Sequence, residues 1–461
     1  MENIIIKDIV ALLRLYDNKH DDVAFFKILS SKLFSIKRLD LSKFTKNVFF
    51  ENYKNKEKKL HLIDGFQFVG KTNIDTENFI IAKQKIDIIL QQKNILELIE
   101  KIFKEFMIIE QAELFDCKKR FEKLEQDIIK FVKEQGFVSI QDIINFVNTH
   151  NFELENKTNT EEHILLDIDY LLINAKMQKD KKQIEKLELK KEKVKNKSKD
   201  LDVSFYTEQI ETNKYQKEKE MLVLPNFSAT QFNMYDTCPN QYRCCYIYSI
   251  PTPKKYFFVF GGIMHKVIEE LTKIIKDGKE VSENFGKQLL LSMWDSNGYQ
   301  TEEQEKEYFA TGEKMIEMFL KRQKELETEL VSIEKKFTIE IERFKINGII
   351  DRIDMEKGGE YLVIDYKTSK TEKDTESLRH DLQLLLYYDG LTKLYGKVPK
   401  MLCHWYLLSD NVVSVVPTIN DLTNIRSKIL DICTSILTEK FEPKKSNACE
   451  WCDFKLLCSK W

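Results

Sequence analysis

Hydrophobic residues in the first third of the chain recur at the spacing of an amphipathic helix. One apolar stripe runs through residues 9–15 and another through residues 25–34, and the same period continues from residue 86 to residue 106. Residues three and four apart lie on one face of a helix, so each stripe can be buried against a neighbouring helix. The pattern predicts a mainly α-helical region over residues 1–173.

The pattern changes in the second half of the chain, where apolar and polar residues alternate in short runs. Alternation with a period of two is typical of β-strands that bury one face. We expect strands at residues 337–342, 344–354, 361–367, 402–408 and 412–416, turns at 345–348 and 357–359, and helices at 382–395 and 419–439. This order predicts an α/β fold for residues 226–461, in which a mixed sheet is flanked by helices.

A charged segment separates the two patterns. Residues 176–200 contain eleven lysines against five acidic residues and lack both Pro and Gly. A charged helical linker over residues 174–225 is the interpretation we favour. The alternative is a basic strip that contacts phosphates, because clustered lysines are enough for salt-sensitive binding to nucleic acid.

Composition constrains this picture only in part. A chain of 461 residues with 42% hydrophobic residues is long enough for two or three folded units. A net charge of -2 neither supports nor excludes a nucleic-acid partner, which requires basic residues on one face rather than a basic total. The start of the chain does not resemble a signal peptide, and no apolar run approaches the roughly 20 residues of a membrane span. We therefore expect a soluble, cytoplasmic protein with no membrane partner.

Two acidic residues follow neighbouring predicted strands. Asp351 closes the run 348–351, Asp365 closes the run 362–365, and Lys367 lies two residues further on, on the same side of its strand. If the strands are adjacent, the two carboxylates converge, and Mg²⁺ needs few protein carboxylates because it keeps waters and accepts phosphate oxygens. The alternative is that all three are ordinary loop residues, since an Asp-x-Lys sequence alone is a weak signal.

The order of further polar residues strengthens the catalytic interpretation. His265 lies on a predicted helix that follows Gly261 and Gly262, and Gln383 and Tyr387 lie four residues apart on the helix after the strands. His265 alone would be an unremarkable helix residue. Its importance depends on the acidic residues and lysine that follow it along the chain.

Taken together, these residues resemble the PD-(D/E)XK nucleases of the RecB type, which include the nuclease domains of the AddA and AddB proteins. The resemblance covers roughly residues 226–461, and the stretches that carry it are Gly262–His265, Gly348–Asp354, Val363–Thr368 and Gln383–Tyr387. It implies that His265, Asp351 and Asp365 hold Mg²⁺ or Mn²⁺. It also implies that Lys367 acts at the attacking water or the phosphate, with Gln383 and Tyr387 in the DNA-binding wall of the catalytic site.

The resemblance implies a function as well as a fold. The expected reaction is hydrolysis of DNA phosphodiester bonds, at single strands or DNA ends, in recombination or repair and within a helicase–nuclease system. A rival interpretation is a non-catalytic DNA-binding module of a helicase complex. Both predict binding to DNA, but only the first requires a divalent metal and Asp365 for cleavage.

Cysteines near the end of the domain suggest a second metal centre. Two residues separate Cys449 from Cys452, and five separate Cys452 from Cys458. Cys238 precedes the nuclease motifs. Four thiolates can hold either Zn²⁺ or a [4Fe–4S] cluster, and the alternative is a set of buried free thiols. The resemblance favours the iron–sulfur cluster, with zinc second, because several RecB-type nucleases use this cysteine arrangement. Cys244 or Cys245 could replace Cys238.

The N-terminal region carries two weaker signals. Residues 8–45, above all residues 13–29, resemble the accessory helical region of UvrD/AddA-type helicases, which implies a helicase subunit as partner. Residues 65–72 also fit the phosphate-loop pattern G-x4-G-K-[ST]. A true phosphate loop joins a buried strand to a helix N-terminus, whereas the strand signal here is weak and the helix signal resumes only after Thr76. We therefore do not favour an ATPase.

Overall fold

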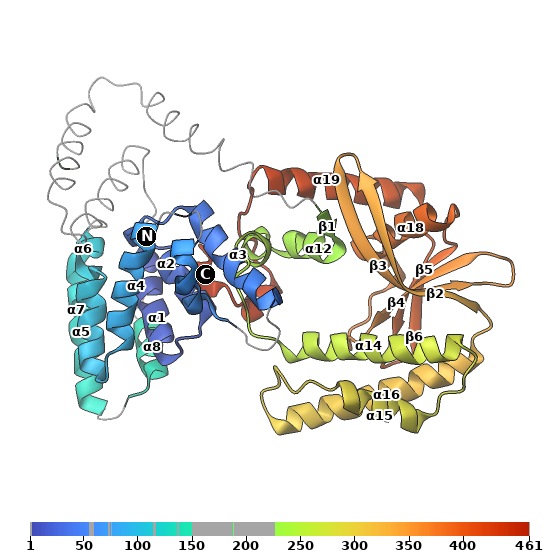
Figure 1. Ribbon diagram of the computed structural model, residues 1–461, viewed down its shortest axis with the longest axis horizontal. Helices are drawn as coiled ribbons and strands as arrows, with labels where there is room; N and C mark the ends of the chain where they lie inside the picture. The colour runs from blue at the N-terminus through green and yellow to red at the C-terminus, as the bar shows by residue number, and fades with distance from the viewer. Residues whose placement is uncertain are drawn as a thin grey trace, which may run out of the picture. The chain divides into compact units, whose positions relative to one another are not determined.

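The computed structural model describes residues 2–54, 60–71, 74, 76–113, 117–135, 138–149, 188 and 226–460. Two compact units divide the chain (Figure 1). The first comprises residues 1–222, 243–252 and 445–461, and the second comprises residues 223–242 and 253–444. The expected linker at 174–225, including its lysine-rich segment, lies outside the described residues except for residue 188.

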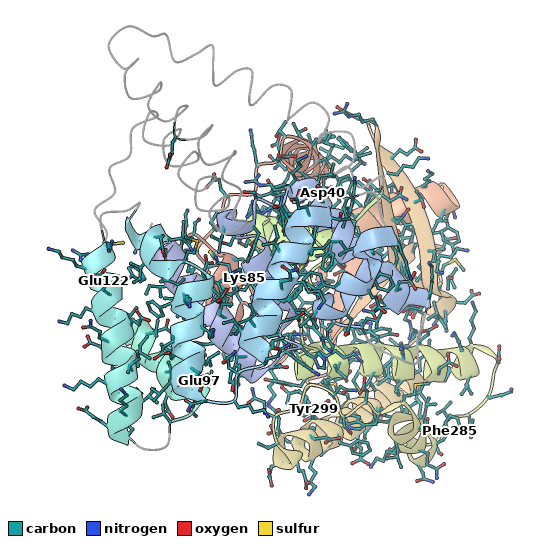
Figure 2. The ribbon with its side chains drawn as sticks, turned by 60° about the vertical axis from the view of Figure 1, so that its left-hand side comes forward. Asp40, Lys85, Glu97, Glu122, Phe285 and Tyr299 are labelled. Atoms are coloured by element: carbon teal, nitrogen blue, oxygen red, sulfur yellow. The ribbon has the colours of Figure 1, made fainter. Side chains whose placement is uncertain are left out.

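The first unit is helical, as its sequence pattern predicts. Its elements up to residue 149 are α1 (Glu2–Asp17), α2 (Asp22–Leu29), η1 (Lys32–Phe34), α3 (Arg38–Lys54), η2 (Leu62–Lys71), α4 (Thr76–Leu90), α5 (Ile95–Glu105), α6 (Ile108–Glu113), α7 (Lys118–Gln135) and α8 (Ile140–Thr149). Helix α5 shows why they pack, because Leu98, Ile99, Ile102 and Phe103 form one buried stripe. The opposite face of α5 is polar: Glu97 is exposed (Figure 2).

Two distant parts of the sequence complete this helical unit. The first is a π-helical turn, η3 (Arg243–Ile247), and the second contains η4 (Asn447–Trp451) and η5 (Lys455–Leu457). Ser42 Oγ donates a hydrogen bond to the Ile247 carbonyl (2.9 Å), and Lys7 Nζ donates one to the Cys458 carbonyl (2.5 Å). The unit therefore includes two segments that the sequence pattern placed within one continuous domain over 226–461.

The segment that resembles a phosphate loop has a different structure. Residues 65–71 belong to the 3-10 helix η2, and Thr72 lies outside the described residues. A Cβ atom at Gly65 would lie 2.7 Å from Val48 Cγ2 and 2.8 Å from Phe44 Cζ, so this glycine permits close helix packing. The geometry differs from a strand–loop–helix phosphate site and favours the interpretation without nucleotide.

The second unit contains a six-stranded mixed sheet. Its strands are β1 (Asn226–Ser228), β2 (Glu329–Ile341), β3 (Phe344–Met355), β4 (Tyr361–Lys367), β5 (Met401–Tyr406) and β6 (Asn411–Val415). The order is β1-β3-β4-β5-β6, and β2 pairs with β3 along its length. The pair β4–β5 is parallel, whereas β2–β3, β3–β4 and β5–β6 are antiparallel.

Helices cover both faces of this sheet (Figure 1). One face carries α14 (Tyr256–Lys276), α15 (Glu283–Met293) and α16 (Glu302–Glu325). The other carries α12 (Ala229–Thr237), α18 (Leu382–Tyr395) and α19 (Ile419–Leu437), while the short helices α13 (Pro239–Tyr242) and α17 (Thr375–Arg379) complete the unit. A core of apolar side chains from α14, α16, β4 and β5 fixes the first layer, and it includes Tyr366 and Trp405. The expected α/β fold with flanking helices is confirmed.

Two local predictions were wrong. Residues 345–348 are not a turn but part of β3, and the β2–β3 turn lies at Glu342 and Arg343, where Glu342 has φ 50°. Gly348 serves packing instead, because a Cβ atom there would lie 2.2 Å from Phe337 Cζ. Likewise, Gly261 and Gly262 do not precede the helix of His265 but lie inside α14, which begins at Tyr256.

None of the helices described here combines the length and apolar character that a membrane crossing requires.

Candidate active site

The candidate site lies where two neighbouring strands separate. The β3–β4 ladder runs from Met355↔Tyr361 to Arg352↔Ile364 and ends there. One residue beyond the last backbone pair, the Asp351 side chain takes the place of a backbone acceptor. Its Oδ2 accepts a hydrogen bond from the Tyr366 backbone N–H (3.0 Å). Asp351 is buried, so the fork holds a carboxylate between the two strands.

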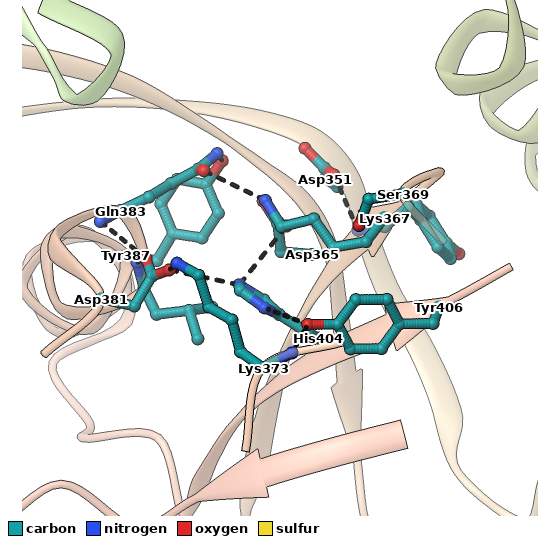
Figure 3. A network of polar contacts seen from close by, with 12 residues as sticks. Asp351, Asp365, Lys367, Ser369, Lys373, Asp381, Gln383, Tyr387, His404 and Tyr406 are labelled. Atoms are coloured by element: carbon teal, nitrogen blue, oxygen red, sulfur yellow. Dashed lines mark hydrogen bonds and ion pairs between the residues drawn. The ribbon is translucent and has the colours of Figure 1, made fainter. Parts of the chain in front are cut away.

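A second carboxylate and a lysine come from β4. Asp365 and Lys367 share one face of the strand, as period-two alternation predicts, and Lys367 Nζ lies 2.5 Å from Asp365 Oδ2 (Figure 3). Lys367 Nζ also donates to Gln383 Oε1 (3.3 Å), and Gln383 Nε2 donates to the Tyr387 hydroxyl (2.8 Å). Because Gln383 and Tyr387 are one turn apart on α18, this helix supports the lysine.

His265 reaches the same fork from α14. Its Nδ1 lies 3.4 Å from Asp351 Oδ2. Burial lowers the pKa of His265, an effect that the Asp365 carboxylate partly opposes. The imidazole is therefore neutral near neutral pH, which is the form in which histidine can bind a metal. The structure thus brings together His265, Asp351, Asp365, Lys367, Gln383 and Tyr387, all six residues expected in the catalytic site.

Negative charge accumulates at this fork. Burial raises the pKa of Asp351 well above its usual range, and the neighbouring Asp365 raises it further. Burial and the same two carboxylates raise the pKa of Tyr387. Burial alone would lower the pKa of Lys367, but the carboxylate of Asp365 outweighs it and the pKa is raised. A cation is the ligand that such a group of acids favours.

The residues fit a divalent cation that takes few protein ligands. Asp365 is buried, and its Oδ2 faces the Lys367 ammonium at 2.5 Å. No group of three or more His, Cys, Asp or Glu side chains in the described part of the chain is arranged as a ready metal cage. Mg²⁺ characteristically uses one or two carboxylates and completes its shell with water and phosphate oxygens. Asp351 and Asp365 are the two carboxylates available here.

Glu334 is a further acidic residue that the sequence pattern did not reveal. It lies in β2 between Ile333 and Lys335, whose partners Arg352 and Ile350 flank Asp351 on β3. Its φ of 46° interrupts the regular strand. Burial raises its pKa, and neighbouring carboxylates, Asp365 among them, add to the rise. A glutamate within a stretch rich in Glu and Lys carries no sequence signal of this kind.

A polar network on the other side of Asp365 was also missed. It consists of Lys373, Asp381, His404 and Tyr406 (Figure 3). Asp381 is the N-cap of α18, where its Oδ1 accepts from the backbone N–H groups of Gln383 (3.0 Å) and Leu384 (3.1 Å). An aspartate directly before a predicted helix is a recognisable N-cap signal, so this residue could have been identified. His404 is fully buried, and burial lowers its pKa to about 4.

The packing of Phe337 against Tyr387 depends on two glycines. The Phe337 ring of β2 meets the Tyr387 ring edge to face, with centroids 6.0 Å apart. A Cβ atom would lie 2.2 Å from this ring at Gly348 and 2.6 Å from it at Gly390. Both positions therefore require glycine so that Phe337 can pack beneath Tyr387.

The predicted iron–sulfur ligands are divided between the two units. Cys238 follows α12 in the second unit, whereas Cys449, Cys452 and Cys458 belong to the first, as do Cys244 and Cys245. Within the described residues, no three of these thiols are arranged to hold a metal ion. The cluster therefore stays a prediction from the cysteine spacing and the resemblance.

Comparison with known proteins places this geometry in a family. The model of the family described as the PD-(D/E)XK nuclease superfamily matches residues 226–459, just over half of the chain. The chain belongs to the PD-(D/E)XK nuclease superfamily. Members of this superfamily are typically nucleases and generally use divalent metals such as Mg²⁺, so the assignment supports a nuclease.

Individual relatives of this PD-(D/E)XK protein are distant. The Gene 69 protein of Mycobacterium phage L5 is 23% identical over 287 residues, which are 51% of this chain and 97% of the phage protein. A crystal structure of a presumed exonuclease from Eubacterium rectale covers 53% of this chain and 92% of its own chain. Its sequence identity is 11% and its TM-score is 0.32.

Proposed function

We propose that this PD-(D/E)XK protein is a metal-dependent deoxyribonuclease that hydrolyses phosphodiester bonds in single-stranded DNA or at DNA ends. The observation that carries the proposal is the fork between β3 and β4. It gathers Asp351, Asp365 and Lys367 in one site, with two buried carboxylates and the Lys367 ammonium 2.5 Å from Asp365 Oδ2.

In this proposal His265, Asp351 and Asp365 hold Mg²⁺ or Mn²⁺. A divalent cation in such a site lowers the pKa of bound water and neutralises charge on the transferring phosphoryl group. Lys367 supplies a fixed positive charge at the phosphate or orients the attacking water, and Gln383 holds its ammonium in place. The raised pKa of Tyr387 keeps its hydroxyl protonated, so that it can donate to a phosphate oxygen.

A single strand is the substrate we favour, on the basis of α14. Phe258, Gly262 and His265 follow one another at helical spacing and so share one face. The Phe258 side chain is 72% exposed, and a Cβ atom at Gly262 would meet nothing within 4 Å. An exposed ring can stack on an unpaired base, which contributes about 1–3 kcal/mol per base, and the glycine leaves room for a DNA backbone next to His265.

Strand cleavage with matched variants tests the proposal. End-labelled single-stranded and blunt duplex DNA would be incubated with the wild type, Asp365→Ala, Lys367→Ala and Lys357→Ala in Mg²⁺, Mn²⁺ or EDTA. Lys357 is the control, since its side chain is 81% exposed at the turn between β3 and β4. We expect metal-dependent cleavage of single strands that both site variants lower by at least about a hundredfold and the control leaves unchanged.

Three other outcomes would contradict the proposal or a part of it. Folded protein that binds DNA but never cuts it with any metal would favour the non-catalytic accessory module. Cleavage that persists in Asp365→Ala would place the chemistry elsewhere. Equal cutting of blunt duplexes and single strands would remove the single-strand preference.

The iron–sulfur cluster remains a subsidiary proposal that rests on the cysteine spacing and the family resemblance. Iron, sulfide and zinc would be measured in protein purified without oxygen, for the wild type, Cys449→Ser and Cys433→Ser. Cys433 is a matched control because it is buried in α19. The proposal expects about four irons per chain, lost in Cys449→Ser and kept in Cys433→Ser. Zinc instead of iron would favour the alternative metal, and neither metal would reject both.

A role in recombination or repair, with a helicase as partner, is proposed only from the two resemblances, that of residues 226–461 to RecB-type nucleases and that of residues 8–45 to UvrD/AddA-type helicases. It requires that duplex DNA be degraded only when a helicase supplies single strands. Efficient degradation of duplexes by the isolated chain would contradict this requirement.

A further inference from the structure

His404 is a buried polar residue to which the proposed reaction gives no role. It lies on β5 directly opposite Asp365 in the parallel β4–β5 register, so both side chains project from the same face of the sheet. The side chain is fully buried. A histidine in an otherwise apolar strand must find polar partners, because burial of an unpaired polar group costs free energy.

The contacts of Tyr406 are the reason to assign the proton of His404 to Nε2. The Tyr406 hydroxyl accepts a hydrogen bond from the Lys373 backbone N–H (2.7 Å) and lies 3.4 Å from His404 Nδ1 (Figure 3). Since the oxygen already accepts from Lys373, its own hydrogen is available to His404 Nδ1. A neutral imidazole that accepts at Nδ1 carries its proton on Nε2.

The Nε2–H group then faces two carboxylates. Nε2 lies 3.8 Å from Asp365 Oδ2 and 3.7 Å from Asp381 Oδ2. His404 Nε2 is buried and has no hydrogen-bond partner among the described residues, whereas Asp365 Oδ2 lies 2.5 Å from Lys367 Nζ. Asp381 also pairs with Lys373 Nζ (2.7 Å) and caps the helix that carries Gln383 and Tyr387.

We propose that His404 is a positioning residue whose Nε2–H orients Asp365 for the metal and links it through Asp381 to the start of α18. The inference rests on the proposed function, because it assigns a partner to one of the proposed metal ligands. Without this donor, the oxygens of Asp365 and Asp381 face each other across an apolar ring. Asp365 Oδ2 already lies 2.5 Å from Lys367 Nζ, so without His404 that ammonium alone orients the carboxylate and the metal loses a correctly oriented ligand. Groups behind a metal ligand typically change metal affinity by about 10–100-fold.

Calorimetric titration with Mn²⁺ alone tests this inference without depending on catalysis. The variants are His404→Phe, which keeps a ring but removes the donor, and His404→Gln, which restores an N–H donor. Tyr406→Phe removes the hydroxyl that fixes the tautomer, and thermal unfolding accompanies each titration. Cys403→Ala is the control, because Cys403 is the neighbouring residue of β5 and packs into the core on the opposite face of the sheet.

We expect His404→Phe to weaken Mn²⁺ binding by about tenfold or more, Tyr406→Phe to weaken it less, and His404→Gln to restore most of the affinity. Cys403→Ala should lower the melting temperature without changing the affinity. Unchanged binding in His404→Phe, or an equal loss in Cys403→Ala, would overturn the positioning role. If His404→Phe does not fold, Tyr406→Phe takes its place. A loss of Mn²⁺ affinity in Tyr406→Phe that Cys403→Ala does not show supports the positioning role, and equal affinities in the two variants overturn it.

Asp365→Ala, titrated alongside, separates this inference from the proposed function. If Asp365→Ala abolishes Mn²⁺ binding while His404→Phe leaves it intact, only the role of His404 is rejected. If Asp365→Ala binds Mn²⁺ as tightly as the wild type, the metal site itself is rejected.

Discussion

At the scale of single residues, buried charges on β3 divide into two kinds. Asp351 has one backbone donor and a strongly raised pKa. Arg352, by contrast, is fully buried and fully engaged: Nε and Nη2 donate to the two oxygens of Asp354 (2.6 and 2.9 Å), and Nη1 donates to Gln323 (2.6 Å). Buried groups with a strongly shifted pKa and few hydrogen-bond partners are typical of functional sites. A buried bidentate pair whose hydrogen bonds are all formed is typical of structural support. Neighbouring residues of one strand therefore have different tasks.

This distinction predicts the effect of Arg352→Lys. An ammonium cannot reproduce the bidentate pair with Asp354 or the third bond to Gln323, so a buried carboxylate loses part of its compensation. We expect the free energy of unfolding to fall by about 3 kcal/mol, as measured by urea denaturation. Arg426→Lys is a matched control, because Arg426 also forms a two-point pair, with Asp389, but its side chain is 44% exposed. The control should change stability by less than about 1 kcal/mol, and equal losses in the two variants would contradict the argument.

At the scale of elements, α14 combines a buried face with an open one. Met264, Val267 and Ile268 pack against the sheet, while Gly262 leaves a gap one turn before His265. A helix normally gains from alanine in place of an interior glycine, by about 1 kcal/mol. A gap at this point is therefore costly for the helix and is useful only if something must approach closely.

Gly262→Ala should accordingly separate stability from activity. We expect the free energy of unfolding to rise by up to about 1 kcal/mol, because the added methyl group meets no atom within 4 Å. Cleavage of single-stranded DNA should fall by about tenfold or more, since misplacement of substrate by even about 1 Å is costly. Urea denaturation and initial cleavage rates would be measured on the same preparation. A more stable protein with undiminished cleavage would show that DNA does not pass over Gly262.

The strands and helices also show which site residues could be predicted from the sequence. Alternation placed Asp365 and Lys367 on one side of a strand, and helical spacing paired Gln383 with Tyr387, because both depend on local geometry alone. The convergence of Asp351 with Asp365 was a conditional expectation, since it required the strands to be neighbours. The sequence pattern did not reveal Glu334 and His404 because their roles depend on which residues the paired strands place beside each other. Glu334 lies beside Asp351 in the β2–β3 hairpin, and His404 lies opposite Asp365 in the parallel β4–β5 pair. The turn was misplaced to residues 345–348 because Gly348 resembles a turn residue, although tertiary packing of Phe337 explains it.

At the scale of the whole molecule, the first unit is assembled from separate parts of the chain. Phe26 contacts the ring of Tyr248 (centroids 5.0 Å apart), and Ser42 bonds to the Ile247 carbonyl. Near the C-terminus, Phe454 and Leu456 are buried in a segment that belongs to the same unit. Segments that follow the start of the matched nuclease region at residue 226 are therefore packed within the helical unit.

This organisation predicts that the two pieces of a chain cut between residues 174 and 225 stay associated. A recognition site for a specific protease would be inserted between residues 174 and 225, and the cut protein would be passed over a gel-filtration column. Since residues 243–252 and 445–461 belong to the same unit as α1 to α8, we expect both pieces to elute together. Metal-dependent cleavage of DNA should survive the cut. Pieces that separate without denaturant would show that the unit is not held together by these segments.

A fragment that begins at residue 226 provides the complementary case. It keeps every residue of the proposed site but loses α1 to α8, so apolar side chains such as Ile250, Phe454 and Leu456 lose the unit in which they are buried. Burial of a large apolar side chain contributes about 1.5–3 kcal/mol, and exposure of several together favours aggregation. We expect this fragment to aggregate when produced alone and to become soluble when residues 1–173 are produced with it. A soluble, active fragment would show instead that the sheet and its two helical layers are sufficient for the nuclease.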